Sequence, residues 1–236
     1  MENFLEQILR WDRDFFLLLS GCHSSFFDGF MWLFSSMIVW IPMYACVLYV
    51  ILRDKRKEFL FITLGLILTI VLSDQLSSGL IKPMVERLRP SHEPMLTGLV
   101  RLINGYAGGQ FGFVSSHAAN SFAFALCTAL AFRYRPYTFV IFLWAALNSY
   151  SRIYLGVHYP LDVIGGAAVG IVSALFVYMV MSYIKKLYTG FNYKRLGGIN
   201  TTVSGFEHRS IQWIIYFLLL TVGFICLFGY EISKFI

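Results

Sequence analysis

Six long apolar runs limit the folds that this chain can adopt. They extend over approximately residues 30–52, 59–80, 113–132, 137–154, 161–184 and 211–230. A helix needs about 20 residues to cross the hydrocarbon core of a bilayer, where it must satisfy its backbone hydrogen bonds internally. Only 14% of the residues are charged, against about 25% in an ordinary soluble domain. The sequence therefore predicts an all-α fold, a polytopic membrane helix bundle with about six transmembrane helices.

No repeat, low-complexity tract or linker divides these runs, so we expect one integral membrane domain over residues 1–236. Residues 30–184 would form its main helix bundle. Residues 211–230 would add a C-terminal transmembrane helix.

The first twenty residues differ from the apolar runs. They lack the basic start and the small-residue cleavage site of a signal peptide. Apolar side chains recur there at steps of three or four residues, at Phe4, Ile8, Trp11, Phe15 and Leu19. This pattern predicts an amphipathic helix that lies in the membrane interface, and a short buried helix is the alternative.

Basic residues predict the orientation of the bundle. Eleven of the nineteen Lys and Arg residues, among them Lys194 and Arg195, fall in the loops of one side. Cytoplasmic loops carry an excess of Lys and Arg, so this side should be cytoplasmic and both termini should face outward. The formal charge of +6 reflects these loops and anion sites, and we expect no nucleic-acid partner.

Three polar clusters interrupt the apolar pattern. The segment 151–162 contains Arg152, His158 and Asp162. His158 and Asp162 stand four residues apart, so the carboxylate can orient the imidazole if both lie on one helical face. The planar, permanently charged guanidinium of Arg152 presents several N–H groups and is suited to binding a phosphate. The alternative is an interfacial arginine beside a His–Asp hydrogen bond that only locks a loop.

The other two clusters are Lys82 to Pro90, with cations at Lys82 and Arg89, and Val114 to His117 at the start of the third run. Backbone N–H groups and a serine hydroxyl at a helix start can bind an anion. Counting the crossings brings all three clusters to the outer face. Cations, histidines and an aspartate gathered at one membrane surface indicate a ligand site.

These residues resemble the type 2 phosphatidic acid phosphatase superfamily of lipid phosphatases, which also includes glucose-6-phosphatase and the vanadium haloperoxidases. Its first motif is Lys, six residues, Arg-Pro, and its third is Ser-Arg, five residues, His, three residues, Asp. Both are complete here, in Lys82, Arg89 and Pro90 and in Ser151, Arg152, His158 and Asp162. The second motif, Pro-Ser-Gly-His, reads Val114, Ser115, Ser116, His117, so it departs at Val114 and Ser116.

The resemblance implies a phosphatase mechanism. His158 would attack phosphorus and form a phosphohistidine, Asp162 would hold its tautomer, and His117 would act as general acid and then base. The phosphate-binding residues would be Lys82, Arg89, Ser115, Ser116 and Arg152. No metal or cofactor is expected, because the carboxylates are not arranged as a cage for a hard cation.

Two polar positions outside the motifs have alternative roles. Asp74 lies inside the second run, where a carboxylate is functional or bonds to Asn120, Asn148 or Ser149 of another helix. His92 and Glu93 would edge the pocket or lie solvated in the loop.

The motifs indicate that a phosphate group is bound, but they do not identify the molecule that bears it. Arg87 and Arg101 are further cations on the predicted outer side that could contact a second phosphate. Undecaprenyl diphosphate is therefore the leading prediction, with lipid A, phosphatidylglycerol phosphate and phosphatidic acid as alternatives. A lipid or phosphate carrier is the alternative of another class. We expect a site on the periplasmic face of the inner membrane, a membrane lipid phosphate as substrate, a role in cell-envelope lipid metabolism and no obligate protein partner.

Overall fold

A computed structural model describes residues 4–189 and 200–235. Residues 1–3 of the predicted interfacial segment, and Lys194 and Arg195 of the predicted cytoplasmic side, lie outside this range. The main helices are α1 (Phe4–Ser20), α2 (Ser25–Ser35), α3 (Ile41–Asp54), α4 (Phe59–Asp74), α5 (Lys82–Val85), α6 (Ser116–Phe132), α7 (Arg135–Tyr154), α8 (Pro160–Thr189) and α9 (His208–Ser233).

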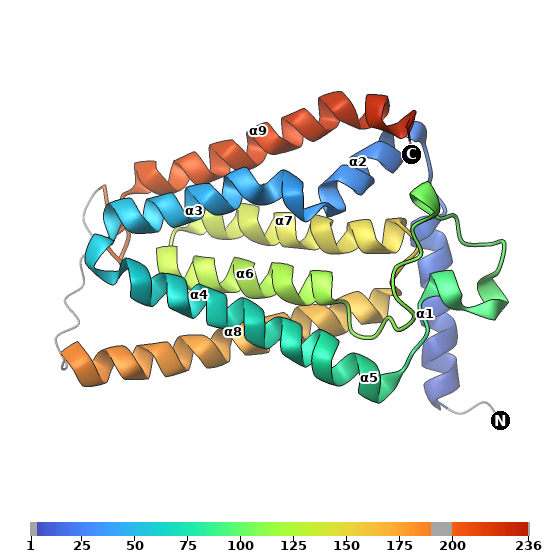
Figure 1. The fold of residues 1–236 in the computed structure, drawn as a ribbon, viewed down its shortest axis with the longest axis horizontal. Coiled ribbons are helices and arrows are strands. Elements are labelled where there is room, and N and C mark those ends of the chain that lie inside the picture. The colour runs from blue at the N-terminus through green and yellow to red at the C-terminus, as the bar shows by residue number, and fades with distance from the viewer. Residues whose placement is uncertain (1–3, 190–199, 236) are drawn as a thin grey trace.

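The long helices run side by side, and α1 crosses one end of their bundle at a steep angle (Figure 1). The described residues contain no β-strand, only two isolated bridges. The predicted all-α membrane bundle is therefore confirmed. Four helical segments are long and apolar enough to cross a membrane, namely Met37–Asp54, Arg56–Val85, Pro160–Tyr188 and His208–Ser233.

The first apolar run, 30–52, is not one helix. It divides into α2 and α3, with Ser36 in an extended conformation and a 3₁₀ turn, Met37–Trp40, between them. Pro42 lies in the first turn of α3, where its missing N–H costs nothing, whereas inside a continuous helix it would break a hydrogen bond. The indole N–H of Trp40 donates to the carbonyl oxygen of Phe34 at 2.8 Å, which satisfies one carbonyl at the end of α2.

The second run extends further than predicted. After α4 the chain continues as a π-helical segment, Gln75–Ile81 (η3), and then as α5, which carries Lys82 and Pro83. A proline displaces the carbonyl four residues before it, and a π-type widening accommodates such a disruption. The path of this helix therefore changes immediately before the first motif residue.

The central helix α6 packs against α4, α7 and α8. Its contact with α8 is close, because Gly166 and Gly170 of α8 face the backbone of α6 at Ser115 and Ala119. Any side chain at these glycines would collide with that backbone, as in small-xxx-small helix pairs. This contact holds the starts of α6 and α8, where His117 and Asp162 lie, next to each other.

Candidate active site

His158 lies in the turn between α7 and α8, just before Asp162. Gly156 ends α7 with φ +75°, a left-handed conformation that glycine adopts without strain. Asp162 follows in the first turn of α8, where the helix dipole favours a carboxylate. His158 is 1% exposed and Asp162 0%. Nδ1 of His158 lies 3.3 Å from Oδ2 of Asp162, so the two side chains meet although His158 precedes α8 and the pair does not share a helical face.

The carboxylate of Asp162 has two further partners. Its Oδ2 accepts the backbone N–H of Tyr159 at 3.0 Å, and its Oδ1 accepts Nη1 of Arg87 at 3.0 Å. A second contact joins Nη2 of Arg87 to Oδ2 of Asp12 at 2.6 Å. Both carboxylate oxygens of Asp162 are therefore held.

The sequence prediction for Arg87 and Arg101 is corrected by these contacts. The sequence suggested that both cations could contact a second phosphate. Arg87 is paired with two aspartates, and Nη2 of Arg101 lies 2.7 Å from Oδ2 of Asp28. Asp12 and Asp28 were not predicted as site residues, and nothing in the local sequence distinguishes the buried Asp12 from the exposed Asp14 on the same helix.

Lys82 approaches the start of α6 from α5. Its Nζ donates to Oγ of Ser116 at 2.7 Å, and Oγ of Ser78 lies 2.7 Å from the same oxygen. Ser116 stands where the related motif has glycine, so its hydroxyl adds a partner for Lys82 that the motif lacks. The side chain of Ser115 caps α6 by accepting the N–H of Ala118, and the N–H of Ser115 donates to the carbonyl of Asp162 at 2.8 Å.

Two buried arginines complete the cluster of cations. Nε of Arg89 donates to the carbonyl of Phe111 at 3.1 Å. Arg152 donates to the hydroxyls of Ser35 and Tyr106, with its guanidinium 5.4 Å from the Tyr106 ring centre. Within the described part of the chain, Nη1 of Arg89 and Nε of Arg152 are buried without a hydrogen-bond partner. Unpaired N–H groups on buried cations are suited to an incoming anion.

The loop that contains Gly108 and Gly112 passes close to this cluster. A Cβ atom at Gly108 would collide with Nη1 of Arg89, and one at Gly112 would lie 2.8 Å from Oδ2 of Asp162. The absence of side chains at these two positions lets the backbone approach the charged groups.

The electrostatics of the cluster favour a neutral imidazole at His158. Burial, together with the positive charges of Arg89, Arg152 and Lys82, lowers the pKa of His158 well below its ordinary value. Burial and the charge of Arg152 also lower the pKa of Arg89. His117, in the first turn of α6, interacts electrostatically with Arg152, His158 and Lys82. The predicted site residues are thus brought together at one end of the bundle.

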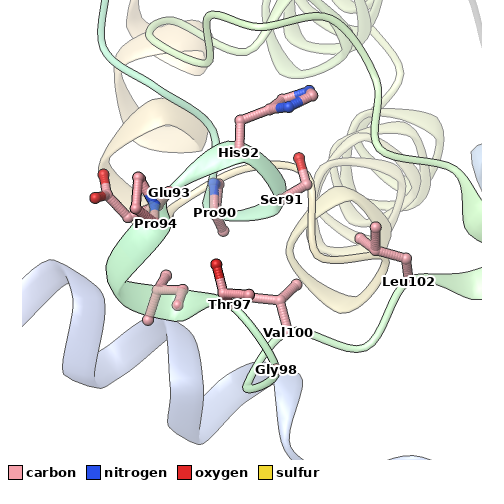
Figure 2. Close-up of a pocket in the computed structure, with 10 residues that line it drawn as sticks. Pro90, Ser91, His92, Glu93, Pro94, Thr97, Gly98, Val100 and Leu102 are labelled. Carbon is pink, nitrogen blue, oxygen red and sulfur yellow. The ribbon is translucent and has the colours of Figure 1, made fainter.

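The polar positions outside the motifs are also accounted for. Nδ2 of Asn120 donates to Oδ1 of Asp74 at 3.1 Å, which is the helix-to-helix hydrogen bond among the two alternatives. His92 and Glu93 line a cavity of about 390 Å³ next to Pro90. Figure 2 shows Pro90 and Thr97 facing each other in it, with the His92 side chain pointing away from Thr97. In the described ranges, no three His, Cys, Asp or Glu side chains gather in a way that could hold a metal ion.

Comparisons with known proteins show the family of this chain. The family model of the PAP2 superfamily matches residues 62–186. The chain is 44% identical over 172 residues to a lipid A 4′-phosphatase of Bacteroides thetaiotaomicron, covering 72% of this chain and 75% of that protein. It is 41% identical over 187 residues to a lipid A 4′-phosphatase of Porphyromonas gingivalis, covering 79% of each.

Two crystal structures have similar folds. Aquifex aeolicus LpxE aligns with a TM-score of 0.55 and 26% identity over 70% of this chain and 93% of that chain. The PAP2-type phosphatidylglycerolphosphate phosphatase of Bacillus subtilis aligns with a TM-score of 0.56 and 20% identity, over 76% and 89%. With its family model matched, its bundle of membrane helices and its three motifs gathered at one end, this chain belongs to the PAP2 superfamily and is a multi-pass membrane phosphatase that hydrolyses phosphate esters.

Proposed function

We propose that this protein is a lipid A phosphatase whose site opens at the outer face of the inner membrane. The observation that supports lipid A as the substrate is the sequence identity of 44% and 41% to two proteins named as lipid A 4′-phosphatases. The leading sequence prediction, undecaprenyl diphosphate, loses its support because Arg87 and Arg101 are already paired with aspartates. The carrier alternative is set aside, since the chain belongs to a family of phosphatases.

The phosphate group would bind among Lys82, Arg89 and Arg152. The unpartnered N–H groups of the two arginines would donate to its equatorial oxygens, together with the backbone N–H groups at the start of α6. These fixed charges would stabilise the transition state as charge redistributes on the phosphoryl group. They supply the positive charge that Mg²⁺ provides in other phosphoryl transfers, so the proposal includes no metal.

In the first step, Nε2 of His158 would attack phosphorus in line with the leaving oxygen. A nitrogen–phosphorus bond forms as the phosphorus–oxygen ester bond breaks, and His117 gives its proton to the leaving alkoxide. Asp162 beside Nδ1 would keep the proton on that nitrogen and stabilise the positive charge that develops on the ring.

In the second step, water would attack the phosphohistidine. His117, now neutral, takes a proton from the water as the new phosphorus–oxygen bond forms. The nitrogen–phosphorus bond breaks, inorganic phosphate leaves and His158 is restored.

A panel of lipids tests the substrate. Purified protein in one detergent is given lipid A, undecaprenyl diphosphate, phosphatidylglycerol phosphate and phosphatidic acid, and kcat/KM is measured from released phosphate. We expect lipid A to give the highest value and His158→Ala to release none. A higher value for any other lipid would reassign the substrate while leaving the chemistry in place.

Cysteine labelling in intact cells tests the orientation. On a background without the four native cysteines, single cysteines at positions 98–109 should react with a membrane-impermeant thiol reagent, and those at 53–58 should not. The reverse pattern would place the site on the cytoplasmic side.

A further inference from the structure

Helix α1, which crosses one end of the bundle (Figure 1), carries a buried carboxylate that the proposed mechanism does not use. Asp12 is 5% exposed, whereas Trp11 and Phe15 on the same helix are exposed. A carboxylate is costly to bury unless charges and hydrogen bonds compensate it. The Asp12 carboxylate therefore needs hydrogen-bonding partners, and those that it has are next to the candidate active site.

Asp12 is bound on both oxygens. Oδ2 accepts Nη2 of Arg87 at 2.6 Å, and Oδ1 accepts the backbone N–H of Leu161 at 2.9 Å. Leu161 directly precedes Asp162 in the first turn of α8, where N–H groups lack partners within the helix. Asp12 thus binds both Arg87, which contacts the Asp162 carboxylate, and the backbone immediately before Asp162.

Arg87 is fixed on several sides. Its carbonyl oxygen accepts the N–H of Gly112 at 2.8 Å, and its guanidinium lies 4.1 Å from the ring centre of Tyr159. That ring packs edge-on against Phe16, one turn after Asp12 on α1, with ring centres 5.4 Å apart. A planar guanidinium held in this way donates to two carboxylates in one geometry.

This arrangement gives the two carboxylate oxygens of Asp162 different partners. Arg87 occupies Oδ1, so Oδ2 is turned toward Nδ1 of His158 and the N–H of Tyr159. If Arg87 were absent, the carboxylate could rotate and the imidazole would lose its orientation. Hydrogen-bond partners of this kind set the orientation of the groups that react.

We propose that Asp12 and Arg87 are positioning residues, through which α1 sets the orientation of the Asp162–His158 pair. The proposal rests on the proposed role of His158 as nucleophile. Neither residue touches the substrate in this account, and the docking of α1 becomes a condition for turnover. The competing role for Arg87 is the one expected from the sequence, direct contact with a phosphate.

The test substitutes Asp12→Asn, which keeps the size of the side chain and an acceptor for Leu161 but removes the charge that faces Arg87. The matched control is Asp28→Asn, because Asp28 is 4% exposed and pairs with Arg101 of the same outer loop without reaching Asp162. The second variant is Arg87→Lys, which keeps the charge but cannot bridge two carboxylates. Each purified protein is assayed with p-nitrophenyl phosphate, and its melting temperature is measured in detergent.

We expect Asp12→Asn and Arg87→Lys to lower kcat about tenfold to a hundredfold with KM changed less than about threefold, while Asp28→Asn keeps the kcat of the wild type. A kcat unchanged in Arg87→Lys, or an equal loss in Asp28→Asn, would overturn the proposal. A rise in KM alone would assign Arg87 to phosphate binding and would overturn it as well. If Asp12→Asn fails to fold, Arg87→Lys decides by the same criteria.

The soluble ester keeps this test separate from the substrate proposal. A wild type that hydrolyses it but prefers another lipid removes lipid A as substrate without affecting the positioning residues. If His158→Ala retains turnover of the ester, the nucleophile assignment fails, and the positioning proposal fails with it.

Discussion

Gly112→Ala should slow the reaction by moving the carboxylate that orients His158. The added methyl carbon would lie 2.8 Å from Oδ2 of Asp162, 3.3 Å from Cγ of Arg89 and 3.5 Å from its Cα. Nonbonded contacts to a methyl carbon are rarely shorter than about 3.4 Å, so Oδ2 has to move by about 0.6 Å. The backbone of Arg89 blocks relaxation on the other side.

The size of the effect follows from this displacement. A misplacement of about 1 Å can cost about a hundredfold in rate, so a shift of about 0.6 Å predicts a loss of about tenfold in kcat, or about 1.4 kcal/mol of transition-state stabilisation. The assay is kcat with p-nitrophenyl phosphate, beside the melting temperature in detergent.

The control for this prediction is Gly109→Ala in the same loop. A Cβ atom at Gly109 meets nothing within 4 Å and its φ is not positive, so this variant should match the wild type. A Gly112→Ala enzyme with the kcat of the wild type would refute the reasoning, because it would mean that the orientation of Asp162 does not limit the rate. Equal losses in both variants would instead indicate a general effect of stiffening the loop.

Three further predictions concern the nucleophile, the absence of a metal and the effect of pH. His158→Ala should abolish phosphate release while the protein stays folded in detergent, because binding and charge stabilisation remain without a nucleophile; near-normal release would contradict the mechanism at its centre. Activity should persist in excess chelator, and vanadate at about 100 times its Kd should add about 2.7 kcal/mol to the free energy of unfolding; rescue by a divalent ion after inhibition by chelator would argue for another mechanistic class. Because the pKa of His158 is lowered in the folded protein, its imidazole takes up a proton just below about pH 6.5 only in the unfolded chain. The free energy of unfolding should therefore fall with decreasing pH by up to about 1.4 kcal/mol per pH unit. Melting temperatures from pH 7.5 to 5.5 should show a weaker dependence in His158→Gln than in the wild type, and identical slopes would count against the lowered pKa.

The sequence by itself determined the fold class and the identity of the motif residues. Apolar runs of membrane length leave helices as the available structure, and their alternation predicts that Lys82, His117 and His158 meet at one end, where the structure brings them together. The contact between His158 and Asp162 was also expected from the sequence, although it forms between the turn before α8 and the first turn of that helix and not along one helical face. These features depend on periodicity and chain connectivity, which are readable along one dimension.

Only the tertiary structure decided which partners the remaining charged groups take. Arg87 lies two residues from Arg89, so their spacing in sequence does not distinguish a guanidinium that binds Asp12 and Asp162 from one with an unpartnered N–H group in the site. Asp12 is 75 residues away from Arg87, and their pairing depends on how α1 lies across the bundle. A long charged side chain can pair with any opposite charge that packing brings within its reach. Which charges come within reach depends on the tertiary structure, and desolvation penalises a buried charge that stays unpaired.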